Sequence, residues 1–199
     1  MLGWVLTSIA SGLVISRTGR YRLFPISGTL LVVVGFWMLT QLDAGSSTLN
    51  ATEDMLVIGL GMGLMFQTYT LAVQNAVPPR EMGIASAAVQ FFRSIGGTFA
   101  VAAFGTILTT RLNSNLSARL GSEASRINPQ RLLASPDSVH TLPPHLVEGV
   151  RLSLADALHS VFLVALPLVG LALVLSFVLK ELPLRTERGI EATEVAPPA

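Results

Sequence analysis

The chain reads Ser86-Ala-Ala-Val-Gln90-Phe-Phe-Arg93-Ser-Ile-Gly96-Gly97-Thr98 within an apolar run from about residue 83 to residue 108. Such a run exceeds the ~20 residues that a helix needs to cross a bilayer. A charge near the middle of a membrane helix costs from about 2.5 to more than 10 kcal/mol. The Arg93 side chain therefore needs a partner or a water-filled cavity rather than lipid.

The polar side chains of this run fall on one face of a helix. Positions spaced by four, three and four residues stack above one another, and lipid-compatible side chains fill the remaining face. The pattern predicts a membrane helix with one face turned to a hydrated interior. A structural ion pair or a clamp on backbone carbonyls remains the alternative for the arginine. The polar face holds Ser86, Gln90, Arg93 and Gly97, and the apolar face holds Val89, Phe92, Ile95 and Phe99.

The composition indicates an all-α integral membrane protein. The chain has 199 residues, of which 51% are hydrophobic and 13% are charged, whereas a soluble domain carries about 25% charged residues. The net charge of +1 gives no reason to expect a nucleic-acid partner. The absence of cysteine excludes disulfides and thiolate catalysis. About five transmembrane helices and their loops would use the whole length.

The apolar segments predict the order of the spans along the chain. Between the spans, basic residues concentrate in 17–22 and 78–82 and after residue 180, and this places those segments in the cytoplasm. The first span is about five residues short of the ~20 required, so we expect that its beginning is missing. The expected spans are 2–16, 23–42, 55–77, 83–108 and 160–179, grouped as residues 1–180, with an external loop at 113–155 and a disordered cytoplasmic tail at 181–199.

The third span carries a second stripe of small and polar residues. Gly59-x-x-x-Gly63 predicts a close helix crossing, and the Gly96-Gly97 pair of the fourth span is assigned the same role. Gln67, Thr70 and Gln74 continue the stripe, and we interpret them as lining a substrate cavity together with Gln90 and Arg93. Hydrogen bonding between packed helices is the alternative for the three side chains of the third span.

Smaller features lead to weaker predictions. Ser8, Gly12 and Ser16 repeat every four residues, a spacing that allows close helix contact. Apolar residues at helical spacing over 146–161 predict an amphipathic helix leading into the fifth span. Asp156 and His159 at its mouth could relay a proton, although solvated interface residues are the commoner reading. His140 and His145 are too sparse for a metal site, so no metal is predicted.

The segment from Gly12 to Arg22 resembles the cytoplasmic loop motif of the major facilitator superfamily. Gly12, Arg17, Gly19 and Arg20 match that motif, while Ser16 replaces its acidic residue and Tyr21 one of its basic residues. The segment from Gln74 through Pro78 and Arg93 to Gly105 looks like the penultimate helices of the fourteen-span drug:proton antiporter branch, the EmrB/QacA type. The long loop before the last span fits that branch as well.

The resemblance implies a C-terminal part of a multidrug-type exporter in the cell (inner or plasma) membrane. The five spans would correspond to the tenth to fourteenth, with the first, third and fourth around the cavity and the second and fifth peripheral. Amphipathic compounds would leave by alternating access, driven by proton influx and without a cofactor. The implied partners are membrane lipid, the missing N-terminal half and the small amphipathic substrate.

Two other classes compete with the transporter interpretation. A small membrane scaffold or accessory subunit without transport activity would share the apolar composition. An enzyme is disfavoured, because the sequence has neither a His/Asp/Glu cluster with metal spacing nor a Gly-x-Ser-x-Gly element.

Overall fold

A computed structural model describes residues 2–43, 45–134 and 143–179, and all regular structure in these residues is helical. The predicted tail at 181–199 and His140 lie outside the described residues. This part of the chain agrees with the predicted all-α class. The elements are α1 (Leu2–Thr18), α2 (Leu23–Leu39), α3 (Thr48–Ala76), η1 (Pro79–Glu81), α4 (Met82–Leu120), η2 (Gly121–Arg126), α5 (Pro129–Ala134) and α6 (Pro144–Val178).

Three helical segments are long and apolar enough to cross a membrane: Thr48–Ala76, Pro79–Ser125 and Leu146–Val178. The helix α2 is also apolar, but its 17 residues fall short of the ~20 that a span needs. The helix α1 has 17 residues as well and a lower mean hydropathy, because it contains Thr7, Ser8, Ser11 and Ser16. The membrane-spanning role of these two shorter helices stays a prediction.

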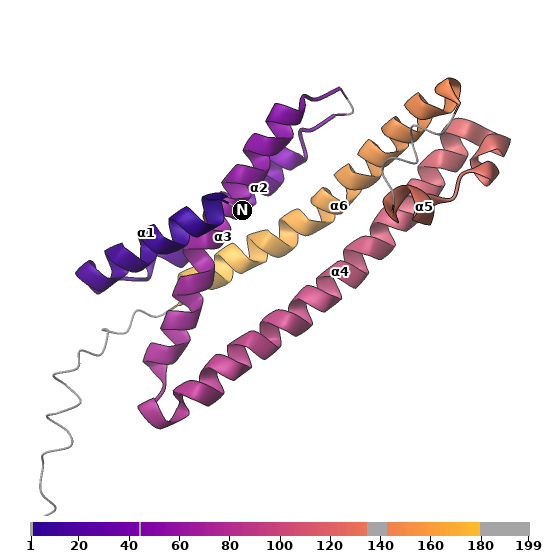
Figure 1. The fold of residues 1–199 in the computed structure, drawn as a ribbon. Helices are drawn as coiled ribbons and strands as arrows, with labels where there is room; N and C mark the ends of the chain where they lie inside the picture. The colour runs from indigo at the N-terminus through magenta and orange to yellow at the C-terminus, as the bar shows by residue number, and fades with distance from the viewer. Residues whose placement is uncertain (1, 44, 135–142, 180–199) are drawn as a thin grey trace, which may run out of the picture.

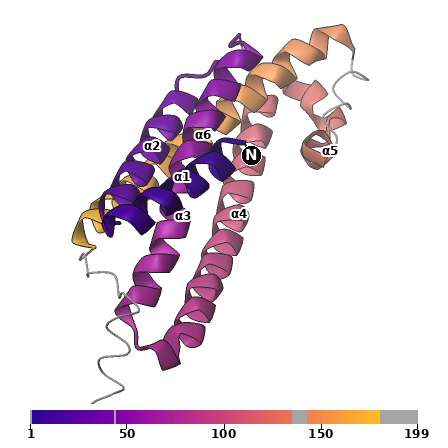
Figure 2. The same ribbon diagram turned by 60° about the vertical axis from the view of Figure 1, so that its left-hand side comes forward.

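The helices form a bundle from which α4 stands apart. In both views of the ribbon, α1, α2 and α3 lie together, and the C-terminal part of α6 runs beside α2 (Figures 1 and 2). The helix α4 leaves the inner end of α3 through the turn at Pro78 and η1, then approaches α6 only toward its own C-terminal end. Among the described residues, a long stretch of α4 therefore packs against no neighbouring helix.

Glycines on α3 let the neighbouring helices approach its backbone. A Cβ atom on Gly61 would lie 2.5 Å from the carbonyl oxygen of Gly28 on α2. A Cβ atom on Gly63 would clash with the Thr7 hydroxyl and the Trp4 carbonyl of α1. The Thr7 hydroxyl also donates a hydrogen bond to the Leu60 carbonyl of α3 at 3.1 Å. Small residues thus bring three backbones together, as close packing in a membrane requires.

The face of α1 that packs differs from the predicted one. Gly3, Ser11 and Ile15 are buried, whereas Ser16 is exposed and no atom of another element lies within 4 Å of a Cβ built on Gly12. Both sets repeat every four residues, so spacing alone could not choose between them. The partner helix decides which face packs. Gly63 on α3 leaves room for Thr7, which lies on the same face of α1 as Gly3, Ser11 and Ile15.

The helix α2 packs against both α3 and α6. Its buried Thr29 hydroxyl lies 3.1 Å from the buried Ser176 hydroxyl of α6, which lies 2.6 Å from the Tyr69 hydroxyl of α3. Each contact between membrane helices of this kind contributes about 0.6 kcal/mol. Three hydroxyls therefore join α2, α3 and α6 at one point, while Leu30 and Trp37 on the other side of α2 remain exposed.

The segment predicted as an external loop, 113–155, is mostly helical in the structure. The helix α4 continues to Leu120 and α6 begins at Pro144, so the two predicted spans are extended toward each other. The amphipathic helix predicted over 146–161 is present as the first half of α6. The extension has its own buried core, made by Leu112, Leu116, Ile127, Leu132, Leu146, Val150 and Ala157.

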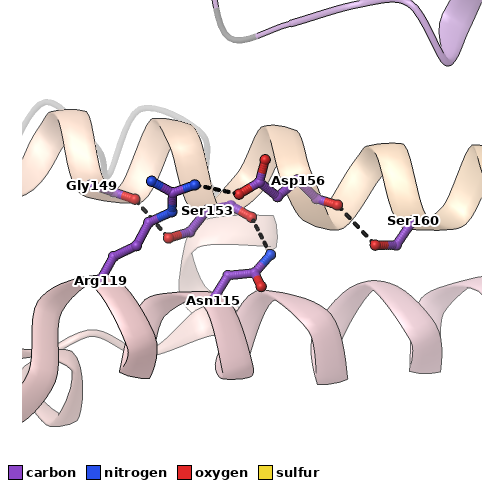
Figure 3. Close-up of polar contacts among 6 residues, drawn as sticks. All are labelled: Asn115, Arg119, Gly149, Ser153, Asp156 and Ser160. Carbon is purple, nitrogen blue, oxygen red and sulfur yellow. Dashed lines mark hydrogen bonds and ion pairs between the residues drawn. The ribbon is translucent and has the colours of Figure 1, made fainter.

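The extension is held by its leucines more than by its polar contacts. Arg119 and Asp156 form an ion pair at 2.6 Å, and the Asn115 amide donates to the Ser153 carbonyl at 3.3 Å (Figure 3). Both charged side chains are about half exposed, so their pair contributes at most about 1 kcal/mol. A fully buried leucine such as Leu116 contributes about 1.5–3 kcal/mol. Apolar burial thus explains why this polar-looking segment forms helices.

We predict that Gly61→Ala destabilises the protein and that Gly59→Ala, on the same helix, does not. The added methyl group at Gly61 meets the Gly28 carbonyl, whereas at Gly59 the nearest atom is the Trp4 nitrogen at an ordinary 3.8 Å. Overpacking of this kind costs about 1–3 kcal/mol. The measurement is the thermal unfolding midpoint of the full-length protein in detergent. Equal midpoints for the two variants would contradict the packing described above.

Candidate functional site

The Arg93 side chain of α4 contacts the neighbouring helix α3. Its guanidinium lies over the Phe66 ring, 4.6 Å from the ring centroid, and donates to the Thr70 hydroxyl at 3.3 Å. A further hydrogen bond of 3.4 Å runs to the Gln90 side-chain carbonyl on its own helix. The structure therefore brings together three of the residues that the sequence placed around a cavity: Thr70, Gln90 and Arg93.

The other two predicted cavity residues lie on the same stretch of α3. The Gln74 amide donates to the Ser86 hydroxyl of α4 at 2.9 Å, so a second polar contact crosses the seam nearer its inner end. Gln67 is exposed, three residues before Thr70 on the same face of α3. These positions form the α3–α4 seam, defined here as Phe66, Gln67, Thr70 and Gln74 on α3 and Ser86, Gln90 and Arg93 on α4.

The contacts of Arg93 do not neutralise its charge. All three partners are neutral, and among the described residues no carboxylate pairs with Arg93. An exposed cation–π contact contributes about 0.5–1 kcal/mol, and a hydrogen bond to a charged group about 1.5–3 kcal/mol at good geometry. The two hydrogen bonds here are long, so together these terms offset only a part of the penalty for a charge in lipid. The seam thus favours a hydrated setting or an acidic partner over a saturated structural clamp.

The rest of α4 offers its surface to something beyond the described chain. None of its most apolar stretch is buried, and Phe92, Phe99 and Val101 are each more than 70% exposed. Gly96 and Gly97 meet no atom within 4 Å of a built Cβ. Their assignment to helix packing therefore stays a prediction that needs a partner outside these residues.

Sequence reasoning missed the aromatic part of the site. Phe66 sits under Arg93, and the Trp4 ring of α1 lies 5.1 Å from it at 42°. Phe66 precedes Thr70 by four residues, so both lie on the same face of α3. Because most residues of this span are apolar, the sequence did not single out Phe66. Arg93 on the next span could have indicated an aromatic partner on α3, because guanidinium groups stack on aromatic rings.

The turn after α1, which the sequence predicts to be cytoplasmic, is shaped by Gly19 and anchored by Arg22. Gly19 has a positive φ of 69°, and its N–H donates to the Ile15 carbonyl at 2.9 Å, which closes the end of α1. Arg22 reaches the Phe177 carbonyl near the end of α6 at 3.1 Å. Arg17 and Arg20 are exposed, and neither side chain contacts another described residue through a hydrogen bond or an ion pair. Among the three arginines of the turn, the described contact with another helix is therefore made by Arg22.

The titratable residues near the outer end do not form a metal centre. Among the described residues, no group of three or more His, Cys, Asp or Glu side chains could hold a metal ion. Asp156, half of the predicted proton relay, is paired with Arg119, and His159 lies one turn further along α6.

A family model described as the Major Facilitator Superfamily matches residues 1–101, which includes the cytoplasmic turn, the α3 side of the seam and Arg93. The chain belongs to the major facilitator superfamily. It is therefore part of a multi-pass membrane transporter family. The family is one of transporters rather than enzymes.

Named relatives of this facilitator include efflux proteins. The multidrug transporter protein MdtP of Bacillus subtilis is 34% identical over 98% of this chain and 40% of its own length. An uncharacterised MFS-type transporter of Mycobacterium tuberculosis, Rv1877, is 33% identical over 92% of the chain and 26% of its own length. The MFS-type efflux pump MMF1 of Mycosarcoma maydis is 27% identical over 96% and 32%. The chain thus spans between a quarter and two fifths of these relatives. No solved structure matches it.

We predict that Gly19→Val impairs this facilitator more than Thr18→Val does. A β-branched residue at φ 69° is strained, and αL conformations cost roughly 1–2 kcal/mol outside glycine, whereas Thr18 is an exposed helical residue. The measurements are the amount of full-length protein in the membrane and its transport rate. Equal and mild effects would reduce the turn to a simple topology signal.

Proposed function

We propose that this chain is the C-terminal part of a multidrug-type efflux transporter that exports amphipathic compounds. It would belong to the fourteen-span EmrB/QacA branch and exchange its substrate for protons by alternating access between two halves. The proton gradient would supply the energy, with no cofactor. The names of MdtP and MMF1 support export, and the cytoplasmic turn supports the superfamily mechanism by analogy.

The observation that carries this proposal is the unneutralised guanidinium of Arg93 in the α3–α4 seam. A fixed positive charge between membrane helices, held only by Phe66, Thr70 and Gln90, has donors left for another group. In a transporter it would pair with a carboxylate of the other half and lower that group's pKa in the state where they meet. Release of the pair would then couple proton uptake to the change of access.

The same proposal assigns partners and place. The N-terminal half would cover the bare surface of α4, including Phe92, Gly96 and Gly97, and lipid would cover the outer sides of α2 and α6. The protein would span the cell membrane several times with its C-terminus in the cytoplasm, because the basic turn at 17–22 and the tail share one side.

The alternative is a small membrane scaffold or accessory subunit without transport activity. The bare face of α4 would then bind another membrane protein, and Arg93 would pair there permanently. The two functions differ in one respect, since only the transporter requires Arg93 to change its surroundings during a cycle.

We predict that Arg93→Ala abolishes efflux in the full-length transporter while the protein remains in the membrane. Arg93→Lys keeps the charge but loses the planar fork, so it should retain a minor part, with at least a ~tenfold loss of rate. Gln90→Ala and Gln74→Ala should alter the substrate profile more than the protein level. The measurement is the drug efflux rate, normalised to membrane-inserted protein.

Arg111→Ala is the matched control, because Arg111 is exposed on the same helix about five turns beyond Arg93. It should leave efflux near normal. Normal efflux by Arg93→Ala would overturn the functional role of the seam. Loss of the Arg93→Ala protein from the membrane would favour the permanent clamp and with it the scaffold.

We predict that single cysteines at Ser46 and Ser122 react with an impermeant thiol reagent added to intact cells, and that one at Thr193 does not. This chain contains no cysteine, so with any cysteines in the rest of the transporter replaced each label reports one position. Labelling at residue 193 would contradict the proposed cytoplasmic C-terminus.

A further inference from the structure

A cavity of about 350 Å³ lies at the predicted outer end of the bundle, between the turn that joins α2 to α3 and the middle of α6. Ligand pockets have volumes of roughly 300–1,000 Å³, so this cavity could hold a small organic molecule. It is separate from the α3–α4 seam, because Met55 in its wall precedes Phe66 by eleven residues, roughly 16 Å along the helix.

The walls of the outer cavity are mostly apolar. Leu39 of α2, Met55 of α3 and Leu158 of α6 line it, together with Phe162. The Phe162 ring is fixed by an edge contact with Phe36 of α2, at 6.4 Å between centroids and 72° between planes. A ligand with a flat apolar body could pack its rings against these side chains.

One carboxylate stands on the rim of this apolar cavity. Asp43 belongs to the turn after α2, and its own backbone is held by two hydrogen bonds with Ser46, each of 2.9 Å. Its side chain has no hydrogen bond or ion pair with any described residue. The turn therefore presents a charge at a fixed place without using it in the fold.

The charges around the cavity favour a cation. The lining contains the carboxylate of Asp43 and the imidazole of His159, and no Lys or Arg. A neighbouring cavity of about 400 Å³ shares Asp43 and His159 with the first, and its other acid, Asp156, is paired with Arg119. The unpaired acid of the shared rim is thus Asp43, among the residues described.

We propose that the outer cavity is a binding site for an amphipathic organic cation, separate from the α3–α4 seam. The apolar body of the ligand packs against Leu39, Leu158 and Phe162, and its positive charge lies against the Asp43 carboxylate. The site exists whether or not the seam exports the same compound, and it places a cationic amphiphile at the outer membrane–water boundary.

A local labelling experiment tests this site with ethidium as the probe. Ala51→Cys places a thiol in the cavity wall, and Asn50→Cys places one on the adjacent exposed position of α3. The protein is the full-length transporter without other cysteines, in phosphatidylcholine vesicles, labelled with an impermeant maleimide. Ethidium should slow labelling at position 51 by about fivefold and leave position 50 unchanged.

The charge is tested by two matched acid-to-amide variants in the Ala51→Cys protein. Asp43→Asn should raise the ethidium concentration for half-protection by about fivefold, as the loss of an exposed ion pair does. Glu53→Gln removes an equal charge from an exposed residue outside the cavity and should leave that concentration unchanged. Phenylnaphthylamine, a neutral aromatic amphiphile, should protect less well than ethidium.

Three results would overturn the proposal: no protection at position 51, equal protection at position 50, or half-protection unaffected by Asp43→Asn. Protection by phenylnaphthylamine as strong as by ethidium would also overturn it, because the cavity would then be a neutral lipid or amphiphile site. The readout needs no transport, so intact protection in a protein that fails to export ethidium would contradict only the proposed function.

Discussion

Membrane helices gain little from apolar contact with one another, because lipid tails are as apolar as leucine, so close backbone approach must hold them together. In this chain α3 supplies that approach. Gly61 meets Gly28 of α2, and Gly63 admits Thr7 of α1. The α6 helix then joins through Ser176, which Thr29 and Tyr69 reach. The position of every functional side chain on α3 follows from these contacts, since its remaining face is the one left for α4.

The helix that carries the charge is fixed at its two ends and bare between them. Its inner end follows the turn at Pro78, and its outer end packs on α6 through Leu112 and Leu116. Between these points Arg93 reaches back to α3, and the Gln74–Ser86 hydrogen bond is the next contact inward. A helix supported in this way holds a charged side chain between its two packed ends and leaves a large surface that no described residue covers.

The outer end of the chain adds a second level of organisation. Buried leucines prolong α4 and α6 beyond the predicted spans, and this extension positions Asp156 and His159 beside the α2–α3 turn. The outer cavity exists only because this part of α6 is helical and lies against the turn that carries Asp43. Helical extension and cavity thus have one cause, the burial of apolar side chains on two long helices.

The sequence by itself determined the helical membrane class, the polar face of the fourth span and the family, because these depend on composition, local spacing and short motifs. It could not predict that Gly61 rather than Gly59 is the glycine at the close crossing with α2. Both lie on one helix, and only the position of α2 distinguishes them. It also missed Phe66 under Arg93. It assigned most of 113–155 to a loop, because the leucines that bury one another there lie on separate segments, as Leu116 and Leu146 do at 30 residues apart. Tertiary structure decided these points, because each depends on which surfaces of distant helices meet.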